Sequence, residues 1–238
     1  MIVNYNQEGW QIVTQRAHGL LAAQICLHWK KDKQPKQWLE TLMATAEHDD
    51  VYNELDNPNL LDPNGAPLNF KLNGFEQDLA QRLIDMAETK SAYLALLISK
   101  HIQFVHGSDP KSKNFVKNLL IKEKRWLKTA ETNQSEINRS YELLEFCDAF
   151  SLLLCQGMIQ PEGRKIQIGN GPNQQRYDMH EKDDVLIVEP WPFEQPSFNV
   201  HYEYRTIKQL TFSNSSEFRK AFKEALVVTH RLTLARET

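Results

Sequence analysis

The 238-residue sequence lacks a broad excess of basic side chains. It contains 28 Lys and Arg against 31 Asp and Glu, which gives a net charge of −3. Proteins that hold nucleic acid through its phosphates carry a basic field on one face. The one basic stretch, KNLLIKEKRWLK at residues 117–128, has the pattern of a solvated helix face. The sequence therefore predicts no nucleic-acid partner.

Long apolar runs and paired cysteines are also missing. The longest apolar runs, such as AYLALLI, are far shorter than the roughly 20 residues that cross a bilayer. The N-terminal segment has no basic region followed by an apolar core, so no signal peptide is expected. The three cysteines form no CxxC, and an odd number without a secretion signal is typical of reduced, buried thiols. We expect a cytoplasmic protein with no membrane partner.

No glycine-rich phosphate loop is present. The segment GNGPNQ at residues 169–174 is predicted to be a turn between strands, and no helix follows it. A phosphate-bearing substrate would therefore need side chains or a metal ion to hold it.

Apolar residues recur at helical spacing through the first two thirds of the chain. They predict helices over residues 15–29, 37–49, 75–88, 91–105, 112–129 and 135–156. The segments IQI, DVLIVEPWPF and FNVHYEYRTI have the pattern of strands, and SNSSEFRKAFKEALVV that of a C-terminal helix. IVNY and WQIVT flank a turn at Gly9 and predict a hairpin that joins the same sheet.

The predicted fold class is mainly α, an α+β protein overall. A helical bundle over residues 15–157 would carry a small antiparallel sheet, formed by the N-terminal hairpin and the C-terminal strands. Residues 1–14 and 158–238 would be accessory parts of a single domain spanning 1–238. In VEPWPF the aromatic side chains are expected to cover the sheet, and an interaction surface is the alternative.

Ionisable groups occupy positions where four predicted helices call for apolar core. His18, His101 and Asp148 fall on apolar stripes, and the adjacent pair His48-Asp49 closes a helix. Each alone fits a hydrogen-bonded core histidine or half of an ion pair, and the His48-Asp49 pair also fits a solvated helix end. Burying a carboxylate without a partner is costly, however. Several such groups would be stabilised together if they converged on one divalent cation, such as zinc, manganese or iron.

The order of these residues resembles that of the HD superfamily of metal-dependent phosphohydrolases. The similar pieces are Q-x-x-H at residues 15–18, A-E-H-D at 46–49 and C-D-A-F-S-L at 147–152. Along nearly its full length, the chain is also similar to the uncharacterised DUF3891 family of bacterial proteins. That similarity lies in IVNY…WQIVTQ…H, in AEHDD with the following LD…G.P..F loop, in ALLISKH and in VEPWPF.

The superfamily resemblance implies a metal ion and its ligands. It implies that manganese, iron, zinc or nickel is held by His18, His48, Asp49 and Asp148. It further implies hydrolysis of a small phosphorylated molecule or nucleotide. Some HD nucleotidases carry an acidic residue three positions after the motif Asp, where this sequence has Tyr52.

Catalytic and substrate-binding roles follow from the same resemblance. Asp49 and His101 would be catalytic, His101 as a further ligand or as the donor to the departing oxygen. Lys100 and Asp50 would contact the substrate, with Lys90 a further source of positive charge. His106 is interpreted as a helix-end residue first and a ligand second. The remaining histidines of the C-terminal third, His180, His201 and His230, receive no role.

The segment from Asn53 to Phe70 is predicted to be an ordered loop over the mouth of the site. It leaves directly after the His48-Asp49 pair and carries apolar anchors such as Leu60 and Leu68. Two other functions stay open at this stage. One is a non-catalytic metal-binding or regulatory protein, and the other is a structural protein without a metal. Metal content and phosphoester turnover distinguish them.

Overall fold

The computed structural model describes residues 1–237, which form a curled sheet and two groups of helices. The strands are β1 (Ile2–Asn6), β2 (Gly9–Val13), β3 (Ile166–Gly171), β4 (Gln175–Lys182), β5 (Val185–Glu189), β6 (Ser197–Ile207) and β7 (Val227–Ala235). The helices are α1 (Gln15–Leu27), α2 (Trp38–Glu47), α3 (Gln77–Glu88), α4 (Ala92–His106), α5 (Lys113–Thr129), α6 (Gln134–Cys155) and α7 (Ser215–Glu224). Within residues 1–237, no helix is both long and apolar enough to cross a membrane.

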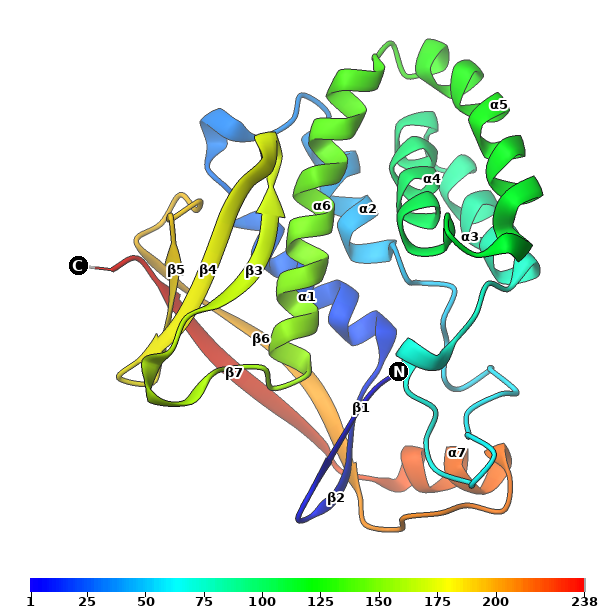
Figure 1. The fold of residues 1–238 in the computed structure, drawn as a ribbon, viewed down its shortest axis with the longest axis vertical. Coiled ribbons are helices and arrows are strands. Elements are labelled where there is room, and N and C mark those ends of the chain that lie inside the picture. The colour runs from blue at the N-terminus through cyan, green and yellow to red at the C-terminus, as the bar shows by residue number, and fades with distance from the viewer. Residues whose placement is uncertain (238) are drawn as a thin grey trace.

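All seven strands belong to one mixed sheet in the order β1-β2-β6-β7-β5-β4-β3. Neighbouring strands are antiparallel except β5 and β7, which are parallel. The long helices α1 and α6 lie between this sheet and the helices α2 to α5 (Figure 1). The N-terminal hairpin therefore joins the sheet through β2 and β6, as expected from the sequence.

Two apolar clusters lie on opposite sides of α6. One fills the curl of the sheet and includes Ile25, Phe146 and Met179. The other lies among α3, α4, α5 and α6 and includes Leu97 and Trp126. Each such buried side chain contributes about 1.5–3 kcal/mol relative to an exposed one. Because α6 carries apolar residues into both clusters, its position is fixed from two sides.

The predicted fold class is wrong. The chain is about 48% helix and 22% strand, with a seven-stranded curled sheet shaped like a half-barrel, so it is an α/β protein. It is not a mainly helical HD-like bundle with a small antiparallel sheet. One segment that differs from the prediction is VVTHRLTLA, whose first two residues are predicted to end the C-terminal helix. It forms β7 in the middle of the sheet, because α7 ends at Glu224 and Ala225 already has extended backbone angles.

The loop from Asn53 to Phe70 is packed against the fold through its apolar anchor Leu60, as expected, but the middle of the loop lies on α7. Leu60 is buried in a third apolar cluster with Phe212 and Phe218, next to α7. The Arg219 side chain of α7 donates to the Asn57 carbonyl at 2.8 Å. The middle of the loop thus packs on α7, whereas its last residue, Phe70, lines the cavity described below.

Candidate metal centre

Four segments of the chain bring ionisable side chains to one point between α1, α2, α4 and α6. Thr14 caps α1, and its hydroxyl accepts from the Ala17 amide at 3.0 Å, which fixes where the helix begins. His18 then falls on the buried face of α1, with no exposed surface. His48 and Asp49 follow directly after the last residue of α2. The pair therefore ends that helix rather than interrupting it.

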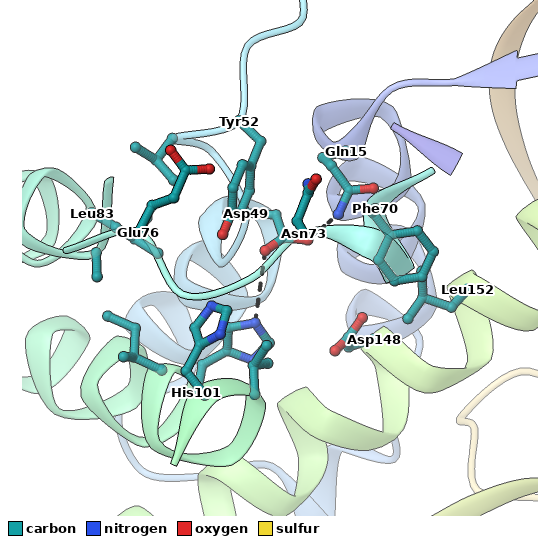
Figure 2. A pocket seen from close by; sticks show the side chains of 15 residues that line it. Gln15, Asp49, Tyr52, Phe70, Asn73, Glu76, Leu83, His101, Asp148 and Leu152 are labelled. Carbon is teal, nitrogen blue, oxygen red and sulfur yellow. Dashed lines mark hydrogen bonds and ion pairs between the residues drawn. The ribbon is translucent and has the colours of Figure 1, made fainter. Parts of the chain in front are cut away.

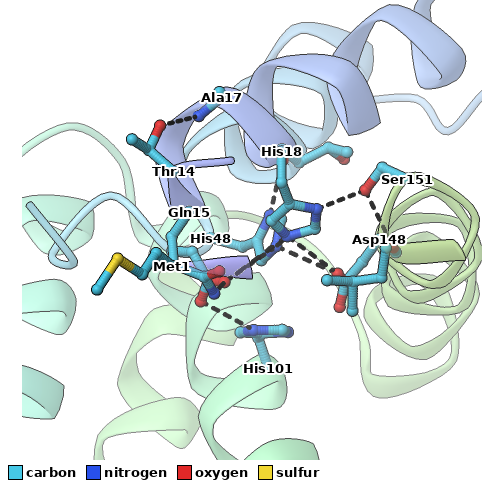
Figure 3. Close-up of polar contacts among 12 residues, drawn as sticks. Met1, Thr14, Gln15, Ala17, His18, His48, His101, Asp148 and Ser151 are labelled. Carbon is cyan, nitrogen blue, oxygen red and sulfur yellow. Dashed lines mark hydrogen bonds and ion pairs between the residues drawn. The ribbon is translucent and has the colours of Figure 1, made fainter. Parts of the chain in front are cut away.

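The side chains of His18, His48 and Asp148 converge closely (Figure 3), and that of Asp49 lies beside them. His18 Nε2 and His48 Nε2 are 3.0 Å apart. Asp148 Oδ1 lies 3.3 Å from the first nitrogen and 3.4 Å from the second. Asp49 Oδ2 lies 3.7 and 3.8 Å from the same two nitrogens. His101 adjoins the group, with Nε2 at 3.8 Å from Asp49 Oδ1.

Hydrogen bonds on the far side of each imidazole orient the two histidine rings. The Ser151 hydroxyl donates to the Asp148 carbonyl at 2.9 Å, so its oxygen accepts from His18 Nδ1 at 2.6 Å. His48 Nδ1 donates to the Thr45 carbonyl at 2.8 Å. With both Nδ1 atoms acting as donors, each Nε2 is left with a lone pair facing the other. Partners of this kind are typical of histidines that bind metals.

The Nε2 lone pairs of His18 and His48 face each other beside two carboxylates, so a proton or a metal ion is needed between them. Burial lowers the pKa of His48, but Asp148 and Asp49 outweigh it and raise the pKa to about 9. Burial raises the pKa of Asp49, yet His48 and the neighbouring imidazoles hold it well below the ordinary value. The pKa of Asp148 is lowered for the same reason. Near neutral pH the metal-free chain therefore holds a proton on His48, which a metal ion would displace.

The spacing of the two imidazole nitrogens fits two ligands of one divalent ion. Two bonds of about 2.0–2.2 Å meeting at a right angle place their ligand atoms about 2.8–3.1 Å apart. The 3.0 Å between the two Nε2 atoms falls in this range. Two sets of three residues, His18-His48-Asp49 and His48-His101-Asp148, have ligand atoms within 4.8 Å of one another. Nitrogen and carboxylate ligands together suit zinc, manganese, iron or nickel.

A cavity of about 110 Å³ adjoins the convergent side chains (Figure 2). That volume holds several water molecules or a small chemical group. The lining residues are Gln15, Asp49, Val51, Tyr52, Phe70, Asn73, Glu76, Ala80, Leu83, His101, Ile102, Val105, His106, Asp148 and Leu152. Apolar side chains from α3 and α4 form one wall, and the two aspartates and His101 form the floor. No Lys or Arg is among these lining residues.

The two residues expected to contact substrate lie outside this lining. Lys100 points toward α5, with Nζ at 3.7 Å from Glu123 Oε2. Asp50 faces Arg16, with Oδ1 at 3.4 Å from Nε. Lys90 is likewise held by Glu47 at 2.5 Å. The side chains expected to supply positive charge to a substrate are therefore paired elsewhere.

His106 is the last residue of α4, as interpreted from the sequence, and it also lines the cavity. Burial and the nearby His101 lower its pKa, so its imidazole is neutral near pH 7. Tyr52, at the position where some nucleotidases have an acid, lines the cavity as well. Burial and the charge of Asp49 raise the pKa of the Tyr52 hydroxyl, which stays protonated.

Sequence reasoning missed the residues that support the site. Ser151 lies one helical turn after Asp148, so the two share a face of α6. The Tyr141 hydroxyl, on the same helix, lies 3.4 Å from His101 Nδ1. Gln15 shares a face of α1 with His18, and its amide donates to Asp49 Oδ2 at 2.7 Å. Ser151 comes three residues after Asp148, and Gln15 comes three residues before His18. This spacing in the sequence is the signal by which both could have been found.

Comparison with known families identifies the family to which the chain belongs. The sequence model of DUF3891, described as a protein of unknown function, matches residues 1–209. The chain belongs to the DUF3891 family. Neither the curated proteins nor the solved structures contain a match. Because the DUF3891 match spans residues 1–209, it covers β1 to β6 and every residue of the convergent cluster.

Proposed function

We propose that this DUF3891 protein is a divalent-metal-dependent hydrolase that acts on phosphate esters of a small molecule or nucleotide. The observation that supports the proposal most is the pair of Nε2 atoms 3.0 Å apart, flanked by two ionised carboxylates that themselves line a cavity. A buried structural ion pair needs no adjoining cavity. A metal-dependent enzyme needs one, because substrate and water must reach the ion.

A divalent ion held by His18, His48, Asp49 and Asp148 would supply a water nucleophile near neutral pH and neutralise substrate oxygen. The chain itself provides the rest of the chemistry. The two carboxylates offset the charge of the ion, and the Ser151 hydroxyl and Thr45 carbonyl keep the imidazoles turned toward it. His101 lines the cavity beside Asp49 and is placed to carry a proton to the departing oxygen.

The choice of phosphate esters rests on residue order. His18, the adjacent His48-Asp49 and the later Asp148 follow the order of ligands in HD phosphohydrolases. The DUF3891 match carries no information about that superfamily, and the curled sheet differs from a helical HD-like bundle. The proposal therefore depends on the side chains and not on the fold.

A non-catalytic metal-binding or regulatory protein is the second candidate. The observation that favours it is the absence of Lys and Arg from the cavity lining. Phosphate sites commonly carry such side chains, because they stabilise charge as it develops on the transferred group. In this chain the ion and His101 would have to do so alone.

Metal content followed by turnover distinguishes the two candidates. Purified protein is dialysed against chelator, reloaded with manganese or zinc, and assayed with p-nitrophenyl phosphate and bis(p-nitrophenyl) phosphate. We expect one strongly bound ion and metal-dependent turnover that His101→Gln reduces by at least tenfold. Lys100→Ala, directed at a lysine paired away from the cavity, is the control and should retain turnover. Bound metal without turnover of either ester would favour the regulatory candidate.

A further inference from the structure

One buried polar atom at the edge of the cavity has no partner. Gln15 is only 4% exposed and lines the cavity. Its Nε2 donates to Asp49 Oδ2 at 2.7 Å, whereas its Oε1 accepts no hydrogen bond from any residue within 1–237. A buried acceptor left without a donor is costly, so in native proteins such an atom usually has a partner, which can be a protein group, an ordered water or an ion.

The orientation of the Gln15 amide is fixed by its neighbours. If the amide were reversed, Oε1 would face the Asp49 carboxylate, and two acceptors would repel each other. The backbone is held as well, because the backbone N–H of Gln15 donates to Glu54 Oε1 at 3.0 Å. That carboxylate also binds the Met1 amino group at 3.3 Å. Rotation of the side chain cannot satisfy Oε1 without giving up the bond to Asp49.

The distances place Oε1 within reach of the ligands of the proposed ion. The oxygen and nitrogen of one amide are separated by roughly 2.3 Å, given C=O and C–N bonds of about 1.23 and 1.33 Å. Gln15 Oε1 is therefore at most about 5 Å from Asp49 Oδ2. An ion about 2.0–2.2 Å from that carboxylate oxygen carries its other ligands about 3 Å from it. A proton-bearing ligand bound on the Gln15 side of the ion would therefore lie near Oε1 and could donate to it.

We propose that Gln15 Oε1 accepts a hydrogen bond from the metal-bound water and makes the ion select ligands that carry a proton. The inference rests on the proposed function, since it requires the ion. Gln15 is a positioning residue: its two amide groups hold Asp49 and the water in one relative geometry. A ligand that can only accept, such as fluoride, would face the Oε1 lone pairs and bind poorly.

Fluoride affinity tests this role without relying on turnover. Cobalt-loaded protein is titrated with sodium fluoride at fixed pH, and binding is followed by visible absorption. Gln15→Met keeps the length of the side chain and removes both polar atoms. We expect it to bind fluoride about three to ten times more tightly than wild type, the equilibrium equivalent of one hydrogen bond. Cobalt affinity is measured in parallel, because loosening of Asp49 alone would weaken cobalt binding without favouring fluoride.

Gln24→Met is the matched control. Gln24 lies on the same helix, but its amide bonds the backbone of His201, with distances of 2.9 and 3.0 Å. This variant should bind fluoride as wild type does. Equal fluoride affinity in Gln15→Met and wild type, with cobalt bound at one equivalent in both, would overturn the inference and leave the metal centre intact. Failure of wild type to bind cobalt would instead refute the proposed function.

A manganese-loaded crystal structure of the wild type covers the case in which Gln15→Met does not fold. The expected result is a metal-bound oxygen within about 3.2 Å of Gln15 Oε1. A metal ion whose water ligands all lie beyond hydrogen-bond distance of that atom would refute the inference.

Discussion

Replacing Asp148 by Asn separates a metal ligand from a structural ion pair. The change keeps the size of a buried side chain and removes one charge. Asp148 Oδ1 lies 3.3 Å from His18 Nε2 and 3.4 Å from His48 Nε2. Among residues 1–237, no other carboxylate oxygen lies as close to both imidazoles. We expect Asp148→Asn to lose most of the stabilisation that metal gives to the wild type.

The size of the effect follows from binding linkage. An ion present at about a hundred times its dissociation constant stabilises the folded state by about 2.7 kcal/mol. For a chain of this size, each kcal/mol raises the melting temperature by about 2–4 °C. The wild type should therefore melt about 5–11 °C higher with manganese or zinc than with chelator. A hundredfold loss of affinity would reduce the rise in Asp148→Asn to about 1–2 °C under the same conditions.

The chelated proteins provide the reference. Asp148 is one of two carboxylates that raise the pKa of His48 from 6.5 to about 9, and each pKa unit corresponds to about 1.4 kcal/mol. Chelated Asp148→Asn should thus be less stable than the chelated wild type by on the order of 1–3 kcal/mol at pH 7. The reasoning is refuted if metal raises both melting temperatures equally. It is refuted equally if metal leaves the wild type unchanged while the chelated variant melts far lower.

Three further outcomes are expected. Ser151→Ala removes the partner of His18 Nδ1 and should weaken metal binding by about 10–100-fold in competition with a chelating dye, with circular dichroism unchanged. Protonated His48 contributes stability to the chelated chain that is complete below about pH 6.5 and lost as pH rises through about 9, because its folded pKa lies above its unfolded value. The chelated wild type should therefore melt lower at pH 9 than at pH 6.5, and His48→Gln should flatten that interval. Lys100→Ala should lower stability by about 1 kcal/mol through the loss of Glu123 as a partner, and metal affinity should not change.

The helices that carry the site could be predicted from the sequence. The 3.6-residue recurrence of apolar residues placed α1 at residues 15–29 and α3 at 75–88, within two residues of the observed ends. The same recurrence marked His18 and Asp148 as polar groups on buried faces. Local periodicity was sufficient here, because α1 packs against one apolar cluster and α6 against both.

The sheet was harder to predict, because its central strand depends on distant partners. In β7 only Leu234 is fully buried, so apolar and polar residues do not alternate cleanly. Its place between β5 and β6 is fixed by pairing with residues 185–189 and 197–207, which no local pattern reveals. The positions of Lys100 and Asp50 outside the cavity lining could not be predicted for a similar reason. The side of its own helix on which a residue lies could be predicted, but the neighbouring helix that its side chain contacts could not.

Anomalous diffraction from crystals grown with manganese would locate the proposed ion itself. We expect a peak at about 2.0–2.2 Å from His18 Nε2, His48 Nε2, Asp49 Oδ2 and Asp148 Oδ1, next to the cavity. A peak elsewhere would contradict it, as would the two imidazoles remaining 3.0 Å apart with no anomalous peak between the aspartates in crystals saturated with manganese.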